Sequence, residues 1–440
     1  MDIYEATTLS DKGYGIVIKD KQKFYVPNLL PGEKAEIRFF KSGYGKVERL
    51  IEPSLERVKP KCPRFSDCGG CMLQHIPYEK QLEMKTNAVK NRMHQSGFDE
   101  SLCLPIIGMK EPFFYRNKVQ MIISEKDRKI MSGLFEENTH KIVNIDKCVI
   151  QDEKANEIVK TCRNLMQLQK IKSYDEDKKT GLVRYIFVRI GYETKQILVV
   201  IVTSEEVFPG RNNFVKALRE IHPEITSIVQ NVNSRSTSVV LGDFERVLFG
   251  QGRIEDVLLG KKFTISPKTF YQVNHRQTEI MYKKALELSK PKQDDVVLEL
   301  YSGIGTIGIL FADHVKKVIG VELNKESVKN AIMNARINQA KNIRFYQADA
   351  FEFLHDYVLQ EYRADIVIVD PPREGLDRNV VDKIIELKPE KICYLSCNPD
   401  SLMNDLAFFV KANYQIRRVQ PIDMFPQTYH VESVTLLSLI

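Results

Sequence analysis

Apolar and polar residues alternate in short runs over the first 55 residues, a pattern that predicts strands with one buried face. In "GYGIVIKDKQKFYVPNLLPGEKAEIRFFKSGYGKVERLIEP" the runs are separated by Pro-Gly and Ser-Gly pairs, which favour turns. Because side chains alternate between the two faces of a strand, about half of the aromatic rings are expected in the core. These rings, which are interleaved with Lys and Arg, belong to Tyr14, Phe24, Tyr25, Phe39, Phe40 and Tyr44. The pattern predicts a small β module over residues 1–55.

Helical and strand periodicities are mixed over residues 56–260. The stretch "YEKQLEMKTNAVKNRMHQSG" predicts a helix that ends at a glycine. The stretch "GLVRYIFVRIGYETKQILVVIVT" predicts a hairpin of two alternating strands. We therefore expect a mixed α+β central domain, and outside its cysteines it contains no catalytic motif.

Residues 261–440 have the pattern of an α/β fold. The stretch "DDVVLELYSGIGTIGILFA" predicts a buried strand over 296–301, a glycine loop and a helix. Gly303, Gly305 and Gly308 form the spacing G-x-G-x-x-G, which is typical of nucleotide-binding loops. This spacing predicts a Rossmann-like domain over residues 261–440.

Two acidic residues follow the next strands of this domain. Glu322 ends the second strand, 19 residues after Gly303, where a carboxylate can accept hydrogen bonds from ribose hydroxyls. Asp349 follows a third strand, in a position suited to an adenine edge. These residues fit NAD and S-adenosylmethionine equally well.

The fourth strand separates these two cofactors. In "ADIVIVDPPREGLD" an apolar run over 366–369 ends at Asp370, and the Pro-Pro pair stiffens the loop that presents this carboxylate to the ligand crevice. A dehydrogenase has no use for such a loop, whereas acid-Pro-Pro loops recur in methyltransferases that act on planar bases. The sequence thus favours S-adenosylmethionine.

A cysteine and a carboxylate complete the candidate chemistry. Cys397 follows the strand "KICYLS" at the same predicted edge, where a thiolate can add to C6 of uracil and make C5 nucleophilic. A base must then remove the C5 proton. Glu432 at the start of the last strand is the candidate, and His430 on the same predicted strand face is the alternative.

Charge and the apolar runs of the chain indicate its cellular compartment and its partners. The chain has a net charge of +7, and residues 1–64 hold 13 Lys and Arg against 9 Asp and Glu. This surplus fits a polyanion partner or, equally, a solvated face. The N-terminus lacks the features of a signal peptide, and apolar runs such as "ILVVIVT" are too short for a membrane span. We expect a cytoplasmic monomer with no membrane partner.

Three of the eight cysteines are crowded into "CPRFSDCGGC", namely Cys62, Cys68 and Cys71. In a reducing compartment such clustering suggests a metal site rather than disulfide bonds. Spacing alone leaves zinc and an iron–sulfur cluster open.

The chain resembles the RNA uracil-C5 methyltransferases. The motifs "CPRFSDCGGC", "YQVN", "ELYSGIGTIG", "DPPREGLD", "LSCNP" and "YHVES" occur in the order seen in that family. The chain is most similar to the members that act on 23S ribosomal RNA. The similarity includes residues 1–55, which resemble a TRAM domain, an OB-like RNA-binding barrel. The tRNA-modifying relatives generally lack this domain. It implies a class I S-adenosylmethionine-dependent methyltransferase domain that forms 5-methyluridine.

The resemblance also assigns residues. It places Cys397 as the nucleophile and Glu432 as the base. It implies a [4Fe–4S] cluster on Cys62, Cys68, Cys71 and Cys148, for which zinc is the structural competitor. The implied cofactor contacts are Gln272, Tyr301, Glu322 and Asp370, beside the Gly303 loop and Asp349 considered above. The alternatives are a tRNA uracil-C5 methyltransferase, an NAD-dependent oxidoreductase, and a non-catalytic RNA-binding or iron–sulfur protein.

Overall fold

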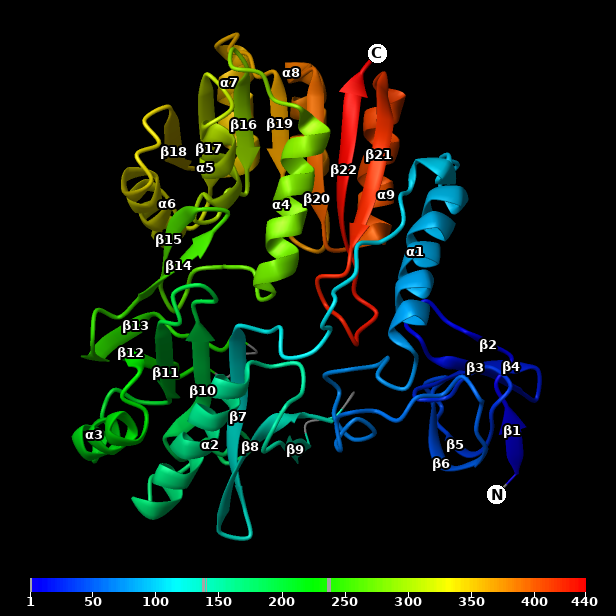
Figure 1. Ribbon diagram of the computed structural model, residues 1–440, viewed down its shortest axis with the longest axis vertical. Helices are drawn as coiled ribbons and strands as arrows, with labels where there is room; N and C mark the ends of the chain where they lie inside the picture. Colours follow the sequence, from blue (N-terminus) through cyan, green and yellow to red (C-terminus); the bar gives the residue numbers. More distant parts are fainter. Residues whose placement is uncertain (1, 137–138, 140, 236–238) are drawn as a thin grey trace.

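The computed structural model describes residues 2–136, 139, 141–235 and 239–440. Strands in these residues form five sheets, two of which have seven strands. Figure 1 shows the N-terminal strands set apart from the two large sheets, with the C-terminal sheet at the top of the view. None of the helices in these ranges is long and apolar enough to cross a lipid bilayer.

The N-terminal strands form two three-stranded sheets, β1-β5-β6 and β2-β3-β4. Their bounds are β1 (Ile3–Glu5), β2 (Thr8–Leu9), β3 (Gly15–Lys19), β4 (Gln22–Val26), β5 (Lys34–Phe39) and β6 (Gly45–Glu52). Small and aliphatic side chains such as Val17, Val26 and Ile37 form their shared core. Within β4, Phe24 is buried and its neighbour Tyr25 is half-buried. Outside the strands, Tyr14 is buried and Phe40 is 43% exposed, so the predicted aromatic residues are divided between core and surface.

The middle of the chain forms a seven-stranded sheet in the order β13-β12-β11-β10-β7-β8-β9. Its elements are β7 (Lys118–Lys126), β8 (Lys129–Phe135), β9 (Ile142–Asn144), α2 (Glu153–Leu168), β10 (Val183–Ile190), β11 (Ile197–Thr203), α3 (Arg211–Ile221), β12 (Ile225–Val232) and β13 (Phe244–Phe249). The predicted hairpin is confirmed, because β10 and β11 pair antiparallel. A separate hairpin of β14 (Ile254–Leu258) and β15 (Lys261–Ile265) lies across the expected domain boundary at residue 260.

The C-terminal sheet has the order β18-β17-β16-β19-β20-β22-β21. Its strands are β16 (Val296–Leu300), β17 (Lys317–Glu322), β18 (Ile343–Gln347), β19 (Ile366–Val369), β20 (Lys391–Ser396), β21 (Tyr414–Ile422) and β22 (Glu432–Leu439). β16 to β20 pair in parallel, whereas β22 is antiparallel to both of its neighbours. The antiparallel β22 distinguishes this order from the all-parallel order 3-2-1-4-5-6 of the dinucleotide-binding fold.

Helices cover both faces of this sheet, because alternate residues of its strands face two different cores. Ile366 and Ile368 of β19 lie in one core, and Val367 and Val369 lie in the other. The first core includes side chains of α4 (His275–Ser289), α5 (Thr306–Ala312) and α6 (Lys325–Ile337). The second includes side chains of α7 (Ala350–Leu359), α8 (Arg378–Leu387) and α9 (Pro399–Lys411). A sheet buried on both faces explains the nearly continuous apolar strands of this region.

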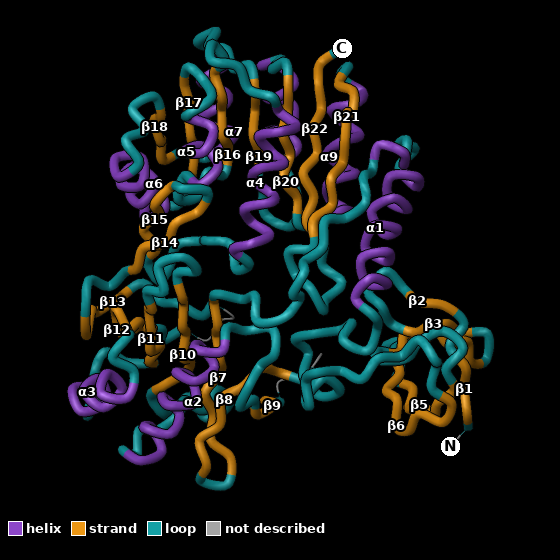
Figure 2. The backbone as a smooth tube through the Cα atoms, in the orientation of Figure 1, coloured by secondary structure: helices purple, strands orange, loops and turns teal. Residues whose placement is uncertain are grey.

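Helix α1 (Tyr78–Gln95) packs on the C-terminal sheet although it belongs to the middle of the chain. Its predicted end is confirmed, with Gly97 in the left-handed region at φ +75°. Val89 and Met93 of this helix lie in the second core with β21 and α9. In Figure 2 the helix stands beside β21, and the chain then runs down into loops between the two large sheets. A short 3₁₀ helix over Glu100–Leu102 follows it.

Candidate active site

The glycine loop between β16 and α5 requires glycines for separate reasons. Gly303 and Gly305 adopt left-handed φ angles of +54° and +80°. Gly308 donates its backbone N–H to Glu299 Oε2 at 3.1 Å, and a Cβ on Gly308 would lie 2.3 Å from that oxygen. Tyr301 also has a positive φ, of 60°, so β16 ends at Leu300, one residue earlier than predicted.

A pocket lies against this loop at the carboxyl edge of the sheet. Four of the predicted cofactor residues line it together: Gln272, Tyr301, Gly303 and Asp370. They come from the segment before α4, from the end of β16 and from the end of β19. The structure therefore brings together residues that are up to 98 positions apart in the chain.

The other two predicted cofactor residues lie beside the pocket. Glu322 accepts hydrogen bonds from the backbone N–H of Gly303 at 3.0 Å and of Asn324 at 2.7 Å, which fixes its carboxylate against the glycine loop. Asp349 is exposed and caps the N-terminus of α7 by accepting from the N–H of Phe351 at 2.8 Å. The local role of Asp349 is therefore helix capping.

The loop that holds Asp370 is tied to the loop that holds Cys397. The carbonyl of Arg373 accepts hydrogen bonds from Asn398 Nδ2 at 3.0 Å and from Ser401 Oγ at 3.1 Å. Asp405 of α9 accepts from the backbone N–H of Leu376 at 2.9 Å. These contacts join the ends of β19 and β20 into one rigid edge.

Cys397 and Glu432 meet because β22 runs antiparallel to β20. Ser396, the last residue of β20, pairs with Ser433 of β22. Cys397, which directly follows β20, therefore lies beside Glu432, the first residue of β22. Burial, together with the nearby carboxylates of Glu432 and Asp370, raises the pKa of the Cys397 thiol to about 11, and Arg373 opposes this rise. The predicted nucleophile and base thus share one site with Asp370.

His430 does not lie on the strand face that the sequence suggested, because β22 begins only at Glu432. Burial lowers the pKa of His430 to about 4, and Arg373 and Lys85 add to this effect. The imidazole is therefore neutral at pH 7, and its ring contacts Tyr429 and Phe425.

Buried carboxylates dominate the electrostatics of the site. Burial raises the pKa of Asp370 to about 7 and that of Glu299 to about 8, and Asp370 also raises the pKa of Glu299. Burial and the charge of Asp370 raise the pKa of Glu432 well above its ordinary value. A cationic ligand such as a sulfonium compound would relieve this repulsion, whereas the phosphates of NAD would increase it.

Glu299 is a site residue that the sequence analysis missed. It is 2% exposed, lines the pocket and holds the glycine loop through Gly308. The available signal was a single charged residue within the otherwise apolar strand "VVLEL".

The four predicted metal-binding cysteines line a different pocket. Cys62, Cys68, Cys71 and Cys148 lie there beside Arg116 and Lys118. Burial raises the pKa of the Cys71 thiol to about 12 and that of Cys148 to about 11. No group of three or more His, Cys, Asp or Glu side chains in the described part of the chain is arranged to hold a metal ion. The predicted metal site is therefore not seen in the described residues, although its four cysteines line one pocket.

Known proteins with similar sequences are RNA methyltransferases. The family model described as tRNA (uracil-5-)-methyltransferase matches residues 77–440. An uncharacterized RNA methyltransferase of Oceanobacillus iheyensis is 41% identical over 100% of this chain and 97% of its own length. One from Enterococcus faecalis is 40% identical over 99% of this chain and 96% of its own length.

A solved structure has the same overall arrangement. The tRNA (uracil-54, C5)-methyltransferase of Pyrococcus abyssi, in complex with S-adenosyl-L-homocysteine, is 29% identical, with a TM-score of 0.80 over 99% of each chain. The chain belongs to the family of S-adenosylmethionine-dependent RNA uracil-C5 methyltransferases.

Proposed function

We propose that this protein methylates C5 of one or more uridines in 23S ribosomal RNA, through a covalent bond between Cys397 and C6 of the base. The observation that carries the proposal is the side-by-side position of Cys397 and Glu432 at the sheet edge that also holds Asp370. We place this reaction in the cytoplasm, where RNA and S-adenosylmethionine meet.

Each residue has a defined part in the proposed reaction. The Cys397 thiol releases its proton to water, its sulfur bonds to C6, and the electron pair of the C5–C6 double bond moves onto C5 and O4. S-adenosylmethionine would supply the methyl group to C5, with its S–CH3 bond broken and S-adenosylhomocysteine left. Glu432 takes the C5 proton, the electron pair of that C–H bond restores the double bond, and the bond between sulfur and C6 breaks to free Cys397.

The raised pKa values set a condition on this chemistry. The thiol of Cys397 is protonated in the ligand-free protein near pH 7, and burial and the charge of Asp370 favour the protonated carboxyl of Glu432. A cation in the adjoining pocket lowers both pKa values, so cofactor binding prepares the nucleophile and the base. Gln272, Tyr301, Gly303, Glu322 and Asp370 are proposed to hold the cofactor, with Asp349 beside its adenine.

We further propose that Cys62, Cys68, Cys71 and Cys148 hold a [4Fe–4S] cluster. The proposal follows from the resemblance, and what supports it is that all four cysteines line one pocket. Zinc, which four thiolates also suit, is the structural competitor. Arg116 and Lys118 line the same pocket and offer basic side chains beside the four thiols. With four ligands filled, the part of the cluster is structural.

The choice of RNA needs an experiment, because two observations point in different directions. The sequence resembles the ribosomal members of the family, with a TRAM-like module over residues 1–55. The Pyrococcus abyssi tRNA enzyme nevertheless matches 99% of this chain, which favours a tRNA as the second candidate.

Transcripts of 23S ribosomal RNA and of tRNA should be incubated with the protein and methyl-labelled S-adenosylmethionine. We expect label in 23S RNA, mapped as 5-methyluridine, and none with the variant Cys397→Ala. Label in tRNA alone would replace the ribosomal proposal by the tRNA one. Label on neither RNA would overturn both.

A further inference from the structure

The segment over residues 423–431 joins β21 to β22 and leads directly to Glu432. It is 9 residues long, and most of it is buried: Asp423, Met424, Gln427, Thr428 and Val431 are each no more than 5% exposed. Figure 1 shows this part of the chain descending from the sheet into the space between the two large sheets. A buried loop needs internal partners for its polar groups.

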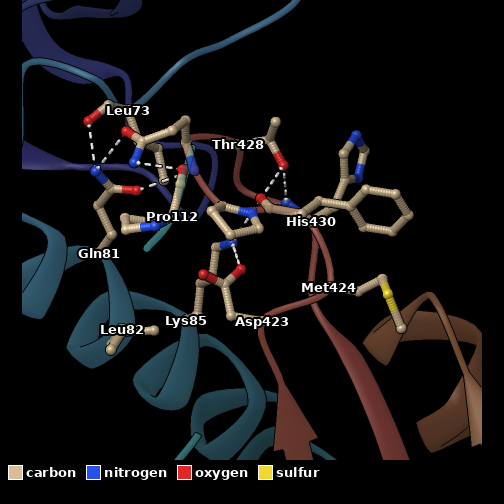
Figure 3. A network of polar contacts seen from close by, with 12 residues as sticks. Leu73, Gln81, Leu82, Lys85, Pro112, Asp423, Met424, Thr428 and His430 are labelled. Carbon is tan, nitrogen blue, oxygen red and sulfur yellow. Dashed lines mark hydrogen bonds and ion pairs between the residues drawn. The ribbon is translucent and has the colours of Figure 1, made fainter. Parts of the chain in front are cut away.

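Helix α1 supplies the first set of partners. Lys85 Nζ lies 2.5 Å from Asp423 Oδ1 and donates to the carbonyl of Phe425 at 3.1 Å. Tyr78 donates its hydroxyl to Asp423 Oδ2 at 2.7 Å. Figure 3 shows Lys85 and Asp423 facing each other below the segment that leads to His430. A buried ion pair adds little net stability compared with apolar side chains, so orientation is the better explanation for this one.

Gln427 is the point at which three other segments meet. Its carbonyl accepts from the backbone N–H of Met72 at 3.0 Å and of Leu73 at 3.1 Å, directly after the cysteine motif. Gln81 of α1 accepts from the N–H of Gln427 at 3.2 Å and donates to its side-chain Oε1 at 3.1 Å. The side chain of Gln427 also donates to the carbonyl of Pro112 at 3.4 Å.

The backbone of Gln427 is held in an unfavourable conformation. Its φ is +71°, in the left-handed region that a residue with a Cβ rarely adopts. Such a conformation persists only where the surroundings fix it, and it is frequent near active sites. Five residues later the chain reaches Glu432.

We propose that Gln427 and the Lys85–Asp423 pair are positioning residues that aim Glu432 at the C5 proton. This inference rests on the covalent mechanism proposed above. Residues 423–431 are held by α1 and by the chain after the cysteine motif. Loss of these contacts would therefore displace the carboxylate of Glu432. Only proton removal depends on Glu432, whereas addition of Cys397 and methyl transfer do not.

RNA that contains 5-fluorouridine separates the two steps, because fluorine cannot leave as a proton does and the covalent complex accumulates without a base. The variant Gln427→Ala should trap fluorinated RNA within about twofold of the wild-type rate. Its turnover on ordinary RNA should fall at least tenfold, with covalent protein–RNA complex accumulating. A loss of packing alone would slow both reactions by the same factor.

A second variant tests the inference in case Gln427→Ala does not fold. In Lys85→Met/Asp423→Leu the ion pair is replaced by apolar side chains of similar size, a kind of replacement that other proteins with buried ion pairs tolerate without loss of folding. It should show the same split between trapping and turnover. The matched control Lys80→Met/Glu83→Leu removes an exposed pair, 3.2 Å apart on the same helix, and should change neither rate.

Two results would count against the inference in different ways. If the wild type traps fluorinated RNA but the variants lose trapping and turnover equally, or lose neither, the positioning role is wrong and the proposed function stands. If the wild type never becomes attached to fluorinated RNA, the covalent mechanism fails and the positioning role fails with it.

Discussion

In the proposed mechanism Cys397 and Glu432 serve successive steps, so replacements of these two residues should have different effects. Cys397→Ala removes the nucleophile, and RNA and cofactor should bind without reacting. Glu432→Gln keeps the nucleophile but cannot take the C5 proton, so a covalent protein–RNA complex should accumulate as a slow band on a denaturing gel. Wild-type turnover by Cys397→Ala would rule out covalent catalysis at this residue.

The buried carboxylates predict that cofactor binding depends on pH. Asp370 and Glu299 have pKa values raised to about 7 and about 8. A cation favours their ionised forms and lowers both values, so binding should release protons near pH 7, and affinity should weaken as the pH falls from about 8 to about 6. Calorimetry in buffers of different ionisation enthalpy measures this release. Binding of S-adenosylhomocysteine, which lacks the sulfonium charge, should release fewer protons. If the two ligands release equal numbers of protons on binding, this role of the carboxylates is excluded.

At the scale of elements, the cysteine segment holds other parts of the molecule together. Protein purified without oxygen should be brown and contain about four irons per chain. Cys68→Ser should lower the melting temperature or RNA affinity while S-adenosylmethionine affinity changes less than about twofold, because the cysteine pocket and the cofactor pocket share no lining residue. Cys103→Ser, at a cysteine outside both pockets, is the matched control. A colourless anaerobic preparation with one zinc per chain would replace the cluster by zinc.

At the scale of the whole molecule, the N-terminal strands form their own core and lie below α1 (Figure 1), and Lys12 between β2 and β3 lies 5.8 Å from the ring centroid of Tyr429. Deletion of residues 1–55 should raise the KM for folded RNA several-fold and leave cofactor affinity unchanged. Binding of the full chain should weaken steeply with salt, since phosphate contacts release counterions. Steady-state kinetics with long transcripts and titration with S-adenosylmethionine test the two parts. Equal KM values for both proteins would assign the module another role.

The sequence by itself determined the local units of this protein. The strand, glycine loop and helix around Gly303, the Asp370 loop after an apolar strand, and the helix that ends at Gly97 each depend on residues that are neighbours in the chain, so periodicity and turn residues were sufficient to predict them. The same holds for Cys397, which directly follows its strand.

Only the tertiary structure decided which of these units meet. Glu432 lies 35 residues after Cys397, and the two are side by side because β22 is antiparallel to β20, a direction that no local pattern encodes. The buried position of Glu299 under Gly308 and the hold of α1 on residues 423–431 likewise come from packing between distant segments. Strand order and direction depend on the free energy of the whole folded sheet, whereas a turn or a helix end depends on a few adjacent residues.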